Sequence, residues 1–90
     1  MLLIVAYDIS DDKPRNKVFK ILKDYGQWMQ YSLFECDLTQ EKYSELRSKL
    51  KKKINPREDS IKFYFVCSSC LDKSNTLGQD NDAKAQAVVV

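Results

Sequence analysis

Asp8 is the residue whose type and position point most directly to chemistry. It follows the apolar run Met1 to Tyr7, where we expect a buried strand. A lone carboxylate in such a place is costly unless a proton or a cation neutralises it. Its oxygens suit a hard cation such as Mg²⁺, which lowers the pKa of bound water and stabilises a phosphodiester transition state. The alternative is that Asp8 caps the turn from Ile9 to Lys13, as aspartate commonly does.

Two acids and two cations of interest follow Asp8, at the start of the first predicted helix. Asp11 and Asp12 suit the N-terminus of a helix, where negative charge is favoured. Arg15 and Lys17 lie near the same end and could hold a phosphate, which an arginine does with two hydrogen bonds. An ordinary solvated helix face explains the two cations equally well.

A second electrostatic feature is a basic segment, residues 47–57, which carries a charge of +6 and no acid. The formal net charge of the chain is only +2, so the other residues together carry −4. This polarity predicts salt-sensitive, sequence-indifferent binding to a polyanion backbone, although cations also suit the C-terminus of a helix. We expect three of the lysines to share a helical face: Lys49, Lys52 and Lys53. The cations of the segment are Arg47, Lys49, Lys51, Lys52, Lys53 and Arg57.

Other kinds of site are less well supported. The chain has no histidine, which excludes serine–histidine and cysteine–histidine nucleophile pairs and imidazole bases. Cys67 and Cys70 form half of a Cys₄ zinc site, and Cys36 adds only a third thiol, so we expect structural or incidental thiols. Three aromatic residues are expected to pack in the fold rather than stack on a ligand: Tyr25, Trp28 and Tyr43.

Length and composition indicate one small domain. Ninety residues with 43% hydrophobic and 31% charged residues bury a thin core, which a partner subunit would help to stabilise. The longest apolar stretch is far shorter than the roughly 20 residues that cross a bilayer, and nothing resembles a secretory signal. We therefore expect no membrane association and a location in the cytoplasm.

Hydrophobic spacing predicts alternating strands and helices. The first ten residues indicate a strand buried on both faces, and a helix follows from Asp11 or Asp12 to a Gly26 with positive φ. Residues 28–38 are long for one strand, so we expect either one long strand or two short ones that the polar residues 30–32 divide. Thr39 caps a helix over residues 40–53, and a strand follows at 61–67. A further short strand is predicted near residues 74–77.

This order predicts an α+β fold, a ferredoxin-like βαββαβ sandwich whose antiparallel sheet has two helices on one face. The helices cover only that face, yet both faces look apolar. A homodimer that pairs sheet with sheet would cover the other face, and it would bring two copies of Asp8 together. The alternative is an uncovered sheet that binds nucleic acid without catalysis, as a module of the RNA-recognition type. The late strand KFYFVC lacks the glycines of that module's signature.

Over residues 1–78 these motifs, taken together, resemble a known family. They are YDISDD after the apolar run, Arg15 and Asn16 at the start of a helix, Gly26, QYSLFEC, and the late cysteine pair. The chain is similar to the small CRISPR-associated protein called Cas two, the non-integrase member of the pair that acquires spacers. The resemblance implies a ferredoxin-like homodimer with both copies of Asp8 at the interface as ligands of a divalent metal.

The resemblance also implies residue roles and partners. Tyr7, Asp8, Arg15 and Phe34 match positions tied to the family's proposed active site, and Lys17 stands where another basic residue is often found. Nuclease activity on RNA or double-stranded DNA has been ascribed to that site. A second role is to bridge dimers of the integrase Cas one and support duplex DNA. The C-terminal segment of the family commonly adds a strand to the partner's sheet, which assigns residues 1–78 to the domain and 79–90 to a tail.

Two functions follow as expectations. In the first, a Mg²⁺-dependent phosphodiesterase, Asp8 of both chains holds the metal and Arg15 helps to bind phosphate. In the second, a DNA-binding scaffold for spacer acquisition, the basic segment carries the affinity. One carboxylate per subunit is a sparse site beside those of two-metal nucleases, so the scaffold is the favoured biological role.

Overall fold

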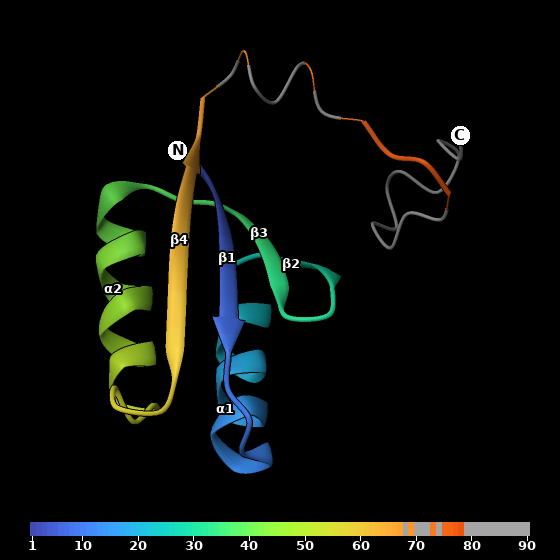
Figure 1. Cartoon of the computed structure of the whole chain (residues 1–90). Helices are drawn as coiled ribbons and strands as arrows, with labels where there is room; N and C mark the ends of the chain where they lie inside the picture. Colours follow the sequence, from blue (N-terminus) through green and yellow to red (C-terminus); the bar gives the residue numbers. More distant parts are fainter. Residues whose placement is uncertain (68, 70–72, 74, 79–90) are drawn as a thin grey trace.

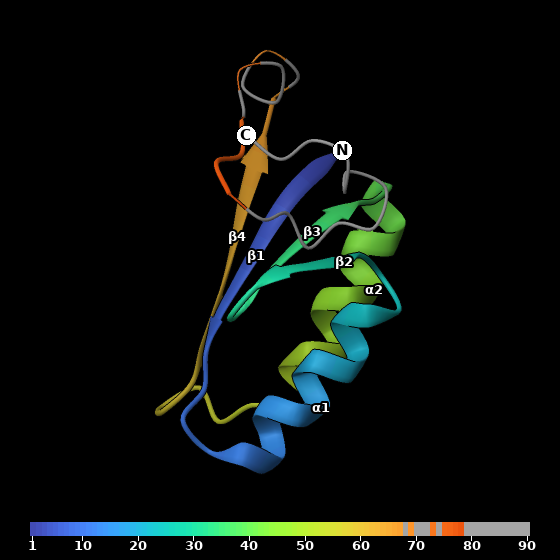
Figure 2. The same ribbon diagram turned by 90° about the vertical axis from the view of Figure 1, so that its right-hand side faces the viewer.

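The fold is a two-layer sandwich of one sheet and two helices (Figure 1). This computed structural model describes residues 1–67, 69, 73 and 75–78. In chain order the elements are β1 (Leu2–Asp8), α1 (Asp12–Lys23), β2 (Gln27–Gln30), β3 (Leu33–Asp37), α2 (Gln40–Lys51) and β4 (Ser60–Val66). The four strands form an antiparallel sheet in the order β2-β3-β1-β4, and both helices lie on the same side of it (Figure 2). The predicted ferredoxin-like arrangement is confirmed.

β1 is a central strand whose two faces have different surroundings. Leu3, Val5 and Tyr7 point toward the helices and are buried, because α1 and α2 cover that face. Leu2, Ile4 and Ala6 have the opposite parity and are only half-buried, so the predicted burial on both faces is incomplete in one chain. The core lies between sheet and helices and consists of Leu3, Val5, Tyr7, Ile9, Val18, Leu22, Phe34, Cys36, Leu38, Leu46 and Leu50.

The aromatic stretch after α1 forms two strands, one of the two predicted arrangements. β2 and β3 form a hairpin, and a turn of Tyr31 and Ser32 separates them. Tyr31 has a φ of 43°, in the left-handed region that bulky side chains rarely adopt. The Trp28 indole N–H donates a hydrogen bond to the Tyr31 carbonyl oxygen at 2.9 Å, and this bond holds the turn against β2.

The end of α1 corrects the prediction for Gly26. The helix stops at Lys23, and Gly26 does not have positive φ, which among described glycines only Gly78 has. The backbone N–H of Gly26 donates to the Leu22 carbonyl at 3.0 Å. A Cβ at Gly26 would lie 2.3 Å from the carbonyl oxygen of Glu35 and 2.4 Å from the Sγ of Cys36. Glycine is needed here because the chain passes close to β3.

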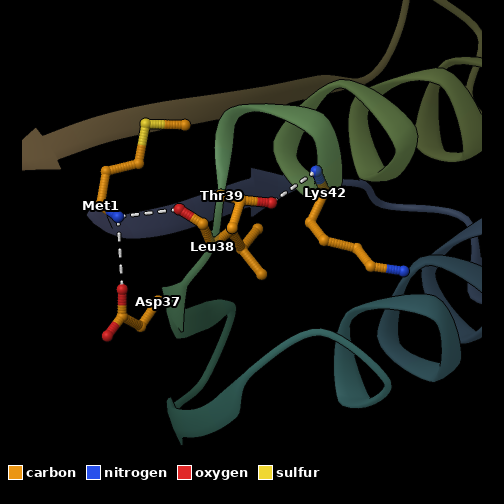
Figure 3. Close-up of polar contacts among 5 residues, drawn as sticks. All are labelled: Met1, Asp37, Leu38, Thr39 and Lys42. Atoms are coloured by element: carbon orange, nitrogen blue, oxygen red, sulfur yellow. Dashed lines mark hydrogen bonds and ion pairs between the residues drawn. The ribbon is translucent and has the colours of Figure 1, made fainter.

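The start of α2 is fixed by two sets of polar contacts (Figure 3). The Thr39 hydroxyl accepts a hydrogen bond from the backbone N–H of Lys42 at 3.2 Å, which confirms Thr39 as the N-cap. The N-terminal amine of Met1 donates to the Leu38 carbonyl at 2.8 Å and lies 3.4 Å from the carboxylate of Asp37. The beginning of β1 is thereby tied to the connection between β3 and α2.

The C-terminal part agrees less with the prediction. α2 ends at Lys51, two residues earlier than expected, and residues 75–77 of the predicted short strand are in no strand. The predicted tail, residues 79–90, lies outside the described residues. No helix in the described part of the chain has the length and apolar character to cross a membrane.

Candidate functional site

Asp8 is the last residue of β1, opposite Ser60 of β4. Its parity places it on the open face of the sheet, the face that the helices do not cover, in line with Leu2, Ile4 and Ala6. The side chain is exposed, and within the described residues it makes no hydrogen bond or ion pair. The alternative role of Asp8 as a cap of the following turn is therefore unsupported. Its carboxylate would become buried only if another molecule covered the open face.

Arg15 holds the connection that follows Asp8. Its Nη1 donates to the carbonyl oxygens of Ile9, at 3.2 Å, and Ser10, at 3.1 Å. Its Nη2 pairs with the carboxylate of Asp12. The guanidinium thus fixes the backbone between β1 and α1, and a phosphate would have to compete with Asp12 for it. Asp11, although it is the N-cap of α1, makes no side-chain cap hydrogen bond.

Tyr7 and Phe34 lie on the opposite face of the sheet from Asp8. Both are buried, and their ring centroids are 6.4 Å apart. Burial raises the pKa of the Tyr7 phenol, while a hydrogen bond with the Ser32 side chain and the charge of Arg15 lower it by less. The end of β1 therefore places Tyr7 and Asp8 on opposite faces of the sheet, with the charge of Arg15 acting on Tyr7 and with Phe34 as a core residue beside the tyrosine.

The basic segment begins in α2 and continues into the loop before β4. Lys49 lies over the Tyr25 ring, 5.1 Å from its centroid. A hydrogen bond with Tyr25, and then the charges of Glu45 and Asp24, raise the pKa of Lys49. Because α2 ends at Lys51, the expectation that Lys49, Lys52 and Lys53 share a helical face is wrong for Lys52 and Lys53, which both follow the last residue of the helix.

The loop cations and Asp8 lie at the same end of the sandwich. β4 starts at Ser60, the residue opposite Asp8, so the loop of residues 52–59 leads from the end of α2 to the edge of the candidate site (Figure 1). Lys52, Lys53 and Arg57 are exposed there. Lys17 is exposed on α1, the helix that starts at this end, and Arg47 donates to the Tyr43 hydroxyl at 3.3 Å.

Comparisons with known proteins agree with this arrangement. The sequence profile of the family described as "CRISPR associated protein Cas2" matches residues 1–74. The chain belongs to the Cas2 family. A Synechocystis protein named "CRISPR-associated endoribonuclease Cas2 3" is 38% identical over 89 residues, 99% of this chain and 97% of that protein.

Two solved structures have the same fold. The crystal structure of Streptococcus pyogenes Cas2 superposes with a TM-score of 0.77 at 32% identity, over 87% of this chain and 100% of that one. A hypothetical protein from Thermus thermophilus gives a TM-score of 0.79 at 34% identity, over 88% of this chain and 92% of that one.

The described residues of one copy do not complete a metal site in this Cas2 chain. Within the described residues, no group of three or more cysteine or acidic side chains is placed to hold a metal ion. Asp8 has the type of donor that Mg²⁺ prefers and no competing partner among the described residues. The donor type fits, and the number of ligands fits only if a second chain contributes.

The two described cysteines, Cys36 and Cys67, join no group of three or more potential metal ligands. Cys36 is buried in the core, and burial, followed by the charge of Glu35, raises the pKa of its thiol to about 11. This supports a structural thiol. Cys67 is exposed, with its Sγ 3.2 Å from the Oγ of Ser69, and Cys70 lies outside the described residues.

All three aromatic residues predicted to pack make contacts within the fold, but Trp28 stays 42% exposed, so packing covers only part of its ring. The Tyr25 hydroxyl donates to Glu45 at 2.6 Å, Tyr43 packs edge-on against Phe63 and Phe65, and Trp28 packs edge-on against Phe19.

Two features of this end of the Cas2 fold were not found from the sequence. One is the contact of Arg15 with the backbone carbonyls after Asp8, since an arginine three residues after Asp12 is as typical of an exposed helix face. The other is the left-handed backbone of Tyr31 at the hairpin turn. This turn lies beside Tyr7, because the backbone N–H of Tyr7 donates to the carbonyl oxygen of Ser32 at 3.1 Å. No glycine or asparagine marks that position.

Proposed function

We propose that two copies of this chain pair through their open sheet faces, and that the homodimer acts in CRISPR spacer acquisition. The observation that carries the proposal is an exposed, unpaired Asp8 at the end of the apolar row that Leu2, Ile4 and Ala6 form on the open face. Solvated carboxylates are common, but this one adjoins partly exposed apolar residues, and burying those residues would lower the free energy of the protein. The half-buried or exposed apolar residues on the open face are Leu2, Ile4, Ala6, Leu33, Tyr64 and Val66.

A two-fold axis suits this face because each copy presents the same patch to the other. Asp8 lies on β1, a central strand, and not at an outer edge, so pairing near the middle of the sheet places one Asp8 of each chain at the seam. Two carboxylates at close range repel each other unless a cation or a proton lies between them. The dimer would therefore complete the ligand set that one chain lacks.

In the isolated dimer we propose that this seam hydrolyses phosphodiester bonds, RNA being the first candidate substrate. The relative from Synechocystis is named an endoribonuclease, which supports this choice. A bound Mg²⁺ would supply Lewis acidity and a water of lowered pKa. The Asp8 carboxylates would bind it, Arg15 holds the connection behind them, and the cations of residues 52–59 bring the polyanion to this end.

The favoured biological role is a scaffold that bridges subunits of the integrase Cas one and supports duplex DNA. The basic segment supports this role, because its exposed cations would bind the phosphate backbone of DNA without regard to base sequence. A module of the RNA-recognition type receives no such support, because Tyr64 is the only aromatic residue on the open face of β1, β3 and β4.

The Asp8→Asn variant separates the two roles. It keeps the size of the side chain and removes the charge, so we expect a dimer that has lost metal-dependent RNA cleavage by a factor of about 100 or more. We expect spacer integration with the integrase to continue at the wild-type rate. Loss of integration in a variant that is still dimeric would contradict the scaffold role, and undiminished cleavage would contradict the metal site. Glu58→Gln, a neutralised exposed acid in the adjacent loop, is the matched control and should change neither activity.

The scaffold role also predicts the salt dependence of DNA binding. Neutralising Lys49, Lys52 and Lys53 to glutamine should weaken binding to a blunt duplex at low salt and reduce the slope of log affinity against log salt by about two to three. Titrating a labelled duplex at several salt concentrations measures both quantities. Neutralising Lys42, which pairs with Glu45 elsewhere on α2, controls for a general loss of charge. An unchanged slope in the triple variant would refute the assignment of the basic segment.

A further inference from the structure

A second surface of the molecule combines exposed aromatic rings with cations, away from the open face. It lies where β2, at the edge of the sheet, meets α1, and we call it the α1–β2 surface. Trp28 is 42% exposed and Tyr31 is 86% exposed, although an apolar ring gains free energy from burial. The side chains that define the surface are Phe19, Lys20, Lys23, Trp28 and Tyr31.

The two exposed rings are held in place. Trp28 donates its indole N–H to the backbone of Tyr31 at 2.9 Å, and its edge packs against Phe19 with centroids 6.5 Å apart. Phe19 in turn packs against the core residue Phe34 at 5.3 Å. The Tyr31 backbone is left-handed, a conformation that asparagine or glycine adopts more readily, yet a large ring stands there in solvent. The fold gains little from this tyrosine.

The charge beside the rings is positive. α1 carries five lysines and arginines against the single acid Asp12, and its lysines are all exposed. The Nζ of Lys23 lies 5.8 Å from the centroid of Phe19, whose ring touches Trp28, so a cation adjoins the aromatic platform directly. Exposed aromatic rings with flanking cations are the combination that binds single strands, where bases stack on the rings and phosphates meet the cations.

We propose that the α1–β2 surface binds single-stranded nucleic acid, with bases stacked on Trp28 and Tyr31 and phosphates held by Lys20 and Lys23. A duplex cannot offer its base faces to these rings, so this surface serves a different ligand from the basic segment. The Tyr31–Ser32 turn is bonded to Tyr7, the neighbour of Asp8. A nucleic-acid strand bound to the α1–β2 surface thus leads toward Asp8. Only this connection to Asp8 rests on the proposed nuclease function.

The test uses Tyr31→Asn, Tyr31→Phe and the fluorescence of Trp28, the only tryptophan in the chain. Asparagine removes the ring and tolerates the left-handed backbone, so the variant should be at least as stable as the wild type. With a labelled single-stranded oligothymidylate of about twelve nucleotides and no divalent metal, Tyr31→Asn should bind about 5- to 100-fold more weakly, and Tyr31→Phe should bind like the wild type. The oligothymidylate should quench Trp28, and an abasic strand of the same charge should not.

Each outcome decides the proposal. Equal affinity of Tyr31→Asn and wild type would overturn it, and so would an abasic strand that binds as tightly as oligothymidylate. Lys20→Gln with Lys23→Gln should lower the salt slope for the single strand and leave it unchanged for a blunt duplex. Because these measurements need neither cleavage nor the basic segment, a failed Asp8 experiment would leave this inference standing, and the reverse also holds.

Discussion

Gly26→Ala tests whether close approach, and not backbone conformation, requires glycine after α1. The added methyl group would lie 2.3 Å from the backbone oxygen of Glu35 and 2.4 Å from the Sγ of Cys36. The oxygen belongs to β3, a strand paired on both sides, and the sulfur is buried in the core. Neither atom can swing away as the end of a flexible side chain could, so β2 or β3 must shift.

The expected loss of stability follows from these two contacts. Overpacking a core usually costs about 1–3 kcal/mol, and a clash with paired backbone belongs at the upper end, about 3 kcal/mol. A chain of 90 residues has a free energy of unfolding of about 5–13 kcal/mol. The variant should therefore lose roughly a quarter or more of its stability, with a decrease in Tm of about 12–24 °C.

Urea unfolding at one fixed protein concentration measures this loss, since dimerisation makes apparent stability depend on concentration. Gly78→Ala is the control: a Cβ there meets nothing within 4 Å, so its positive φ alone should cost about 1 kcal/mol at most. Adding Cys36→Ala to Gly26→Ala removes one of the two clashes and should restore part of the loss beyond what Cys36→Ala itself costs. A Gly26→Ala protein that unfolds at the wild-type urea concentration would refute the reasoning.

Three further predictions concern the open face, the thiols and pH. Ile4→Lys puts a charge in the middle of the open face but outside the core, so sedimentation should show a folded monomer; a folded dimer would contradict the proposed pairing. Iodoacetamide should modify exposed Cys67 before Cys36, whose pKa is raised to about 11 by burial, and mass spectrometry of timed samples would show the opposite order if Cys36 were accessible. Hydrogen bonding to Tyr25 lowers the pKa of Glu45, so its carboxylate stabilises the fold above its ordinary pKa of 4.5 and stops doing so as the pH falls through the lowered value. Glu45→Gln should lower the Tm at neutral pH and not in acid, and an equal difference at both would argue against the ionised form.

Most of the fold could be predicted from hydrophobic spacing, because the apolar residues within each helix or strand follow a pattern typical of that element. The continuous apolar run of β1 predicts a strand, and the stripe through Val18 and Leu22 specifies the face of α1 that the core then uses. Gly26 shows where this fails. Its sequence context is that of an ordinary helix end, whereas its need for glycine comes from β3, a contact between segments that no local pattern contains.

The candidate site was predictable in part for the same reason. Asp8 stands out because it ends an apolar run, which is a local signal. The role of Arg15 depends on where two carbonyl groups of the preceding loop point, and the exposure of Tyr31 depends on a turn without glycine. Such properties arise from backbone geometry after folding. The sequence gives the residue types at these positions, but it does not give the directions in which their backbone and side-chain groups point.

The pairing of the first strand with the last has a consequence for how the chain is made. β1 precedes β4 in the chain and so leaves the ribosome before it, but β4 supplies the hydrogen bonds on one side of β1, with Leu2 opposite Val66. Until residue 66 has been synthesised, the backbone groups on one edge of β1 have no hydrogen-bond partner in β4, and the aliphatic side chains of β1 are exposed to solvent. Nascent chains are thus most prone to aggregate in this interval. A truncated product that ends before β4 would expose the unpaired edge of β1, which could pair with the same edge of another truncated chain.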